Sequence, residues 1–153
     1  MDYKLEVVTL SVNDVDQAAA FYTQLAGFTL DVDYHPAGNF RVVQLTPPGS
    51  GCSIQIGVGL SDAAPGSARA TYLAVTDIEA AHRELTERGV KVSSIRHKSP
   101  VGDWAGDWAP GSDPERRDYA SLADFADPDG NTWVLQEIGH RQPEDTGGTQ
   151  PLA

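Results

Sequence analysis

Several residue types that mark particular classes of protein are scarce in this sequence. Cys52 is the one cysteine, so the chain cannot form an internal disulfide, and nothing indicates an oxidising compartment. No apolar run reaches the roughly 18 residues that a membrane-spanning helix needs. The opening residues, MDYKLEVV, lack the basic and apolar regions of a secretory signal. These absences predict a cytoplasmic location and no membrane partner.

Basic residues are also few. Lysine and arginine total 11 against 22 aspartates and glutamates, which gives a formal net charge of −11 at pH 7. Such a surface repels phosphate backbones, so nucleic acid is not expected as a partner. The charge would attract a cationic ligand, although acidity that only keeps the protein soluble is the simpler interpretation. Hydrophobic residues make up 40% of the chain, which is enough to build a core.

The sequence contains an internal repeat. Its two copies are residues 7–30, VVTLSVNDVDQAAAFYTQLAGFTL, and residues 70–92, ATYLAVTDIEAAHRELTERGVKV. Each copy has the pattern of an alternating strand, an amphipathic helix, a glycine and a second strand. Asp14 corresponds to Asp77 at a separation of 63 positions, whereas Gly27 corresponds to Gly89 at 62. The first helix is therefore expected to contain one extra residue.

The ends of both predicted helices carry sequence signals. Asp14 can cap the first helix, with Gln17 three residues further on. Thr76 and Glu79 form a capping-box pattern at the second. A glycine follows each helix and favours a left-handed stop.

Strand patterns complete two βαβββ modules. Strands are expected at about 5–12, 28–34, 40–46, 52–58, 70–75, 90–96, 119–126 and 131–138. The expected fold is therefore α+β, a single domain over residues 1–139, with modules at about 5–60 and 68–139. Residues 97–118 are predicted to form a long loop, and residues 140–153 a flexible C-terminal tail.

Two stretches of the chain resemble a known family. VTLSVNDVDQAAAFYTQLAGF is similar to the opening of a module of the glyoxalase/bleomycin-resistance/extradiol-dioxygenase (vicinal oxygen chelate) superfamily, and DFADPDGNTWVLQEI is similar to its ending. The resemblance covers about residues 5–138. It implies a mixed sheet cupped around a site for a small organic ligand, and it implies a homodimer.

The resemblance also implies four positions for metal ligands. They fall at Val7, Gln55, Ala70 and Val134, of which only Gln55 has a side chain that could bind a metal. Catalytic zinc needs about three ligands from His, Cys or carboxylate, so a family-type metal site is not expected. None of the four histidines shares a ligand spacing with another. We therefore expect no metal and no cofactor.

Strand alternation predicts which side chains line the cup. The candidates are Val7, Thr9, Ser11, Ser53, Gln55, Gly57, Ala70, Tyr72, Ala74, Thr132, Val134 and Gln136. Trp104 and Trp108 in the long loop add two indoles that could stack over a flat or cationic ligand. They could equally pin the loop to the body of the protein or pack at a dimer contact.

The predicted lining carries little charge, and Asp124 is the carboxylate that could join it. If it faces the cup, it is a candidate general base, with Tyr72 as the second catalytic candidate. The alternative is a solvated carboxylate, or an ion-pair partner for Arg116 or Arg117.

Three functions remain open at this stage. The first is a protein that binds or sequesters an organic ligand without a metal. The second is a metal-independent isomerase or lyase that uses an acid–base residue in the cup. The third, a metal-dependent glyoxalase or dioxygenase, conflicts with three of the four ligand positions. Fold alone does not decide among them.

Overall fold

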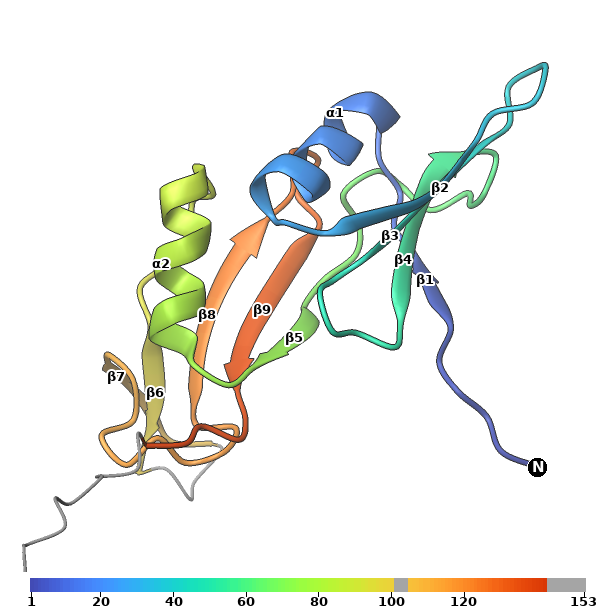
Figure 1. Cartoon of the computed structure of the whole chain (residues 1–153). Helices are drawn as coiled ribbons and strands as arrows, with labels where there is room; N and C mark the ends of the chain where they lie inside the picture. Colours follow the sequence, from blue (N-terminus) through green and yellow to red (C-terminus); the bar gives the residue numbers. More distant parts are fainter. Residues whose placement is uncertain (101–104, 143–153) are drawn as a thin grey trace, which may run out of the picture.

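The computed structural model describes residues 1–100 and 105–142. Two sheets and two helical segments make up the chain (Figure 1). The first half contains β1 (Val7–Thr9), α1 (Val15–Ala20), the π-helix η1 (Phe21–Leu25), β2 (Thr29–Tyr34), β3 (Arg41–Thr46) and β4 (Ser53–Val58). The second contains β5 (Thr71–Val75), α2 (Ile78–Arg88), β6 (Arg96–Ser99), β7 (Asp107–Pro110), β8 (Ser121–Ala126) and β9 (Thr132–Glu137).

Both sheets share one topology. Sheet A has the strand order β1-β4-β3-β2 and sheet B the order β5-β9-β8-β6-β7. In each, the first and last strands of the module pair in parallel, and the other pairs are antiparallel. The internal repeat is therefore reproduced in the strand order, and the expected mixed α+β fold is confirmed.

The first helix absorbs the extra residue that the repeat predicts. Asp14 caps α1, because its side chain accepts a 3.0 Å hydrogen bond from the backbone N–H of Gln17. Beyond Ala20 the chain widens into η1, where the N–H of Ala26 donates to the carbonyl of Phe21 at 2.9 Å. This five-residue separation is the π-helix pattern, which accommodates one inserted residue without breaking the helix.

The second helix begins one residue later than its capping-box pattern predicts. Asp77, and not Thr76, is the N-cap, and its side chain accepts a 3.0 Å hydrogen bond from the N–H of Ala80. Aspartate is as good a cap as threonine or better, so the more polar neighbour takes the position. Gly89 ends α2 in the left-handed conformation with φ 101°, as expected.

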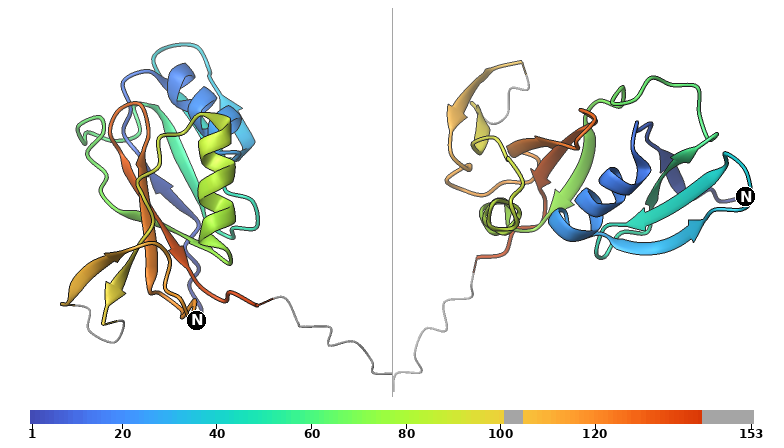
Figure 2. Two further views of the ribbon diagram at one scale, coloured as in Figure 1. Left: turned by 90° about the vertical axis from the view of Figure 1, so that its left-hand side faces the viewer. Right: turned by 90° about the horizontal axis from the view of Figure 1, so that it is seen from above.

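The helix-packed sides of the two sheets meet in one core. Phe21, Tyr22 and Phe28 from the first module contact Phe125 and Trp133 from the second, with ring centroids 5.6–6.4 Å apart. All five rings are buried in the same apolar cluster. Figure 2 shows α1 lying between the two sheets in the view from above. The opposite side of each sheet is therefore an outer face of the chain.

The segment predicted as a long loop contains a hairpin instead. β6 and β7 pair antiparallel, with Lys98 opposite Trp108, and β6 also pairs with β8. The strand predicted at 90–96 begins only at Arg96, because Val90, Val92 and Ile95 turn into the core and do not join the ladder. The second module is consequently one strand longer than the first.

The segment predicted as a flexible C-terminal tail begins at His140, and this residue contacts the body of the domain. Its Nδ1 lies 2.9 Å from the carbonyl oxygen of Thr76.

Within residues 1–100 and 105–142, no helix has the length and apolar character needed to cross a bilayer.

Candidate functional site

The outer face of sheet A carries several of the predicted ligand-contact residues. Val8 and Leu10 pack into the core, so strand alternation turns Val7, Thr9 and Ser11 to the opposite side. Thr9 lies opposite Gln55 in the parallel pair, and the Gln55 amide donates a 2.7 Å hydrogen bond to the Thr9 hydroxyl. The two residues form a small polar patch between the edge strand β1 and its neighbour β4.

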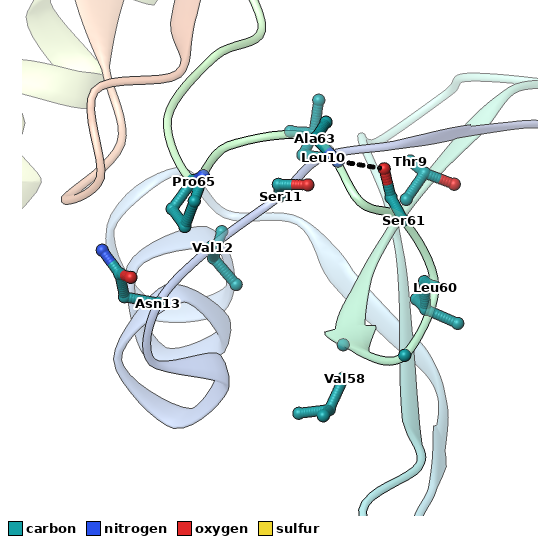
Figure 3. A pocket seen from close by; sticks show the side chains of 12 residues that line it. Thr9, Leu10, Ser11, Val12, Asn13, Val58, Leu60, Ser61, Ala63 and Pro65 are labelled. Atoms are coloured by element: carbon teal, nitrogen blue, oxygen red, sulfur yellow. Dashed lines mark hydrogen bonds between the residues drawn. The ribbon is translucent and has the colours of Figure 1, made fainter.

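A cavity of about 270 Å³ opens beside this patch, where β1 and β4 end (Figure 3). It is lined by Thr9, Leu10, Ser11, Val12, Asn13, Gly57, Val58, Gly59, Leu60, Ser61, Ala63 and Pro65. Gly57 is required by the backbone here, since a Cβ at this position would lie 1.8 Å from the carbonyl oxygen of Arg41. Thr9 and Ser11, both predicted contact residues, therefore border a real cavity.

The outer face of sheet B is organised around Val134. Val134 lies directly between Tyr72 of β5 and Asp124 of β8 in the strand register, so the three side chains form one row. Tyr72 is 55% exposed. In the adjacent row, Gln136 is opposite Leu122, and its amide donates to the carbonyl of Tyr119 at 3.2 Å. Both predicted catalytic residues and two predicted contact residues thus share this face.

Asp124 is paired with a residue that the sequence did not single out. Arg96 of β6 donates to both carboxylate oxygens, at 2.7 and 3.3 Å. The expected alternatives, Arg116 and Arg117, bind Glu137 and Asp113 instead. The ion-pair interpretation is therefore right in kind but wrong in partner, because the strand predicted at 90–96 begins only at Arg96 and its pairing beside Asp124 was not predicted.

Trp108 lies on β7 at the edge of the same face. The Arg96 guanidinium is 4.6 Å and the Lys98 ammonium 4.0 Å from the centre of its ring. The indole is 43% exposed, so part of its surface remains open to solvent. Its cationic partners are the protein's own side chains, in place of the cationic ligand considered from sequence. Trp104, the other predicted indole, lies outside the described residues.

The remaining predicted contact residues are engaged in local structure. Ser53 is buried, with its hydroxyl 2.7 Å from that of Thr46. The Thr132 hydroxyl accepts a 2.7 Å hydrogen bond from the N–H of Ala70. Ala70 itself precedes β5 and has a positive φ of 55°. These residues stabilise the ends of the strands and do not lie at the centres of the two outer faces.

The four positions that would hold a family-type metal do not fit one. Val7, Ala70 and Val134 have hydrocarbon side chains, and the Gln55 amide is hydrogen-bonded to Thr9. Five cavities along the described residues have linings that contain none of these four residues. Metal ligation at these positions has no chemical support.

A different group of potential ligands lies at the end of sheet B. Asp77, Glu137 and His140 bring three ligand atoms within 4.8 Å of one another. Arg116 already occupies this group: it donates to Glu137 at 2.6 and 2.8 Å and to Asp77 at 3.1 Å. A guanidinium bound among these groups repels a second cation, so this cluster is an ion-pair network. Sequence spacing missed it because its members come from separate elements.

A model of one protein family matches residues 4–135, most of the chain. The chain belongs to the Glyoxalase/Bleomycin resistance protein/Dioxygenase superfamily. The resemblance in its opening strand–helix pattern and its DPDGN turn is thereby confirmed. No curated protein matches it.

Solved structures of this superfamily share the fold. TnmS3, an antibiotic binding protein from Streptomyces sp. CB03234, is 28% identical over 89% of this chain and 96% of its own, with a TM-score of 0.66. A glyoxalase/bleomycin resistance protein from the same organism is 28% identical, covering 88% of this chain and 100% of its own, with a TM-score of 0.65. A superfamily member from Sphaerobacter thermophilus DSM 20745 is 27% identical, covering 90% and 98%, with a TM-score of 0.65.

Proposed function

We propose that this protein binds or sequesters an organic small molecule, without a metal, on the outer faces of its two sheets. The observation that carries the proposal is the replacement of three family ligand positions by Val7, Ala70 and Val134, on faces that also carry the exposed ring of Tyr72 and the half-buried amides of Gln55 and Gln136. Such surfaces hold organic ligands by shape and a few polar contacts. Similarity to an antibiotic binding protein supports the same class of function.

A second copy of the chain completes the site in this proposal. The helix-packed sides meet in the core, so the outer faces are the sheet surfaces left for a partner, and Tyr72 is 55% exposed there while Val134 and Leu122 are only 7% and 5% exposed. Val32 and Tyr34 of β2 lie opposite Gln44 and Val42, on the side away from the core residue Val43, and are 42% and 57% exposed. A homodimer would cover this surface and place the face of one sheet opposite that of another. Sedimentation velocity tests this: we expect twice the 16.4 kDa chain mass.

Metal-independent catalysis is the weaker candidate. Tyr72 and Asp124 flank Val134, so two strand spacings, about 10 Å, separate their backbones. Both Asp124 oxygens accept hydrogen bonds from Arg96, which would compete with a substrate proton for them. An isomerase or lyase would need a base that is free to accept a proton.

Ligand binding is tested by a thermal-shift screen of planar aromatic natural products, followed by calorimetric titration of the hits. We expect Tyr72→Ala and Gln55→Ala to weaken binding several-fold, because both remove contacts from the outer faces. Tyr3→Ala is the control, since Tyr3 is 90% exposed near the N-terminus. Ligand recovered unchanged by mass spectrometry supports binding alone, whereas conversion would favour an enzyme. If no compound raises the melting temperature, the proposal fails.

A further inference from the structure

The β6–β7 hairpin places two cations and an indole on the outer face of sheet B. Arg96 and Lys98 are two residues apart on β6, so both point to one side of the strand. Trp108 lies opposite Lys98 in the register and points to that side as well. Arg96 also reaches Asp124, which is in the row of Tyr72 and Val134. The hairpin is therefore continuous with the proposed binding face.

The two cations differ in how they are compensated. Arg96 forms a bidentate pair with Asp124, so its charge is locally balanced. Lys98 makes a 3.4 Å contact with the carbonyl of Gly106, and no carboxylate among the described residues forms an ion pair with it. A carbonyl offers only a partial charge, and the Trp108 ring contributes a weak attraction. Among residues 1–100 and 105–142, Lys98 therefore has no carboxylate partner, and it lies beside the 43% exposed ring of Trp108.

We propose that the ligand of this face is a planar aromatic anion, whose ring stacks on Trp108 while its carboxylate or phenolate pairs with Lys98. This inference rests on the proposed binding function and names the chemical class of its ligand. A charge-assisted hydrogen bond to Lys98 gives direction to a stacking contact that alone would not distinguish one flat molecule from another.

The overall charge of the protein allows a local effect of Lys98 to be distinguished from a general effect of the surface. At a net charge of −11, long-range electrostatics favour a cationic ligand over an anionic one. A preference for the anion must therefore come from a local cation, within about 8 Å at physiological salt. General acidity of the surface predicts the opposite order of affinities.

The test uses three probes with one ring system: naphthalene-2-carboxylate, 2-naphthamide and 2-naphthylmethylammonium. Calorimetric titration of the full chain at pH 7 should give the tightest binding to the carboxylate, by about tenfold over the amide. Lys98→Gln should remove this preference, because it lowers the affinity for the carboxylate far more than the affinity for the amide. Lys98→Arg should retain it. Trp108→Leu should weaken all three probes by a similar factor, because stacking does not depend on the probe's charge.

Lys91→Gln is the matched control, since Lys91 is an exposed lysine outside the hairpin. It removes the same charge and should leave the order of affinities unchanged. Tightest binding of the ammonium, or a carboxylate preference that survives Lys98→Gln, would overturn the anion proposal and leave the binding function intact. If none of the probes binds at millimolar concentration while other compounds stabilise the protein, the anion proposal alone fails. If nothing binds at all, the binding function fails with it.

Discussion

The hydroxyl of Tyr22 donates a 2.8 Å hydrogen bond to Asp127, 105 residues further along the chain. The same hydroxyl accepts a 3.0 Å hydrogen bond from the indole N–H of Trp133. Tyr22 is fully buried, and its burial together with the nearby Asp127 carboxylate raises its pKa far above the ordinary range. The hydroxyl is therefore a permanent donor that joins the first helix of one module to the DPDGN turn of the other.

Tyr22→Phe should lower the free energy of unfolding by about 1–3 kcal/mol, because it leaves Asp127 and Trp133 each short of a buried partner. Urea denaturation followed by circular dichroism measures the change. Tyr3→Phe, at a 90% exposed position, should be neutral. Equal stability of Tyr22→Phe and the parent would show that water replaces the hydroxyl.

Asp113 should make stability depend on pH in the acid range. Hydrogen bonds from the Arg117 side chain, and then from backbone N–H groups, lower the pKa of this fully buried carboxyl from 3.8 to about 2. The unfolded chain takes up the proton first as the pH falls. The stabilisation is therefore complete above about pH 4 and is lost between pH 4 and pH 2, by about 2 kcal/mol.

The comparison of Asp113→Asn with the parent isolates this contribution. The variant should be less stable at pH 7, and the difference between the two proteins should shrink as the pH falls from 4 to 2. Asp62→Asn, an exposed carboxylate, is the control and should follow the parent throughout. A constant difference between Asp113→Asn and the parent at every pH would contradict the assignment.

Local sequence patterns were good predictors of the first module and of both ends of the second module, because the signals involved act over a few residues. Asp14 and Gly89 were found because caps and left-handed stops act within a few residues of the chain. The DPDGN turn was found for the same reason. The π-helix could be anticipated as one extra residue, although only the backbone hydrogen bond from Ala26 to Phe21 shows its form.

Contacts between distant elements were not accessible to the same reasoning. The β6–β7 hairpin contains glycine, proline and aspartate, which obscured its alternation. Arg96 was expected only at the end of a strand and Lys98 in a loop, so neither was expected on the binding face. Basic residues two apart in RHKS were the available signal. The Asp77–Glu137–Arg116 network could not be predicted from the sequence. Its residues come from a helix cap, a strand and a loop, and spacing along the chain carries no information about their proximity.

Arg116 should be critical for stability through Glu137. The Glu137 carboxylate is fully buried and accepts hydrogen bonds from Arg116 and from the N–H of Ile78. Removal of the guanidinium leaves a buried charge without its partner, which costs about 3–5 kcal/mol. Arg116→Met should therefore lower the midpoint of urea unfolding sharply, whereas Arg83→Met, at an exposed position of α2, should not.

The double variant Arg116→Met/Glu137→Gln separates this effect from the shape of the loop. Arg116 has a positive φ of 52°, but methionine and arginine are equally strained there. With a neutral amide at 137, much of the lost stability should return, since the charge no longer needs compensation. If the double variant is as unstable as Arg116→Met, the loss comes from packing and not from the uncompensated carboxylate.

The ligand chemistry of the outer faces predicts that the purified protein retains no stoichiometric metal. Incubation with zinc, iron, manganese and nickel, gel filtration and elemental analysis should give far less than one ion per chain, because Val7, Ala70 and Val134 offer no lone pair. Retained metal that disappears in His140→Ala would identify the Asp77–Glu137–His140 cluster as its site and show that the ion displaces Arg116. Retained metal that survives His140→Ala but is lost in Gln55→Ala would show instead that the family positions do bind one, and metal-free binding would then be wrong.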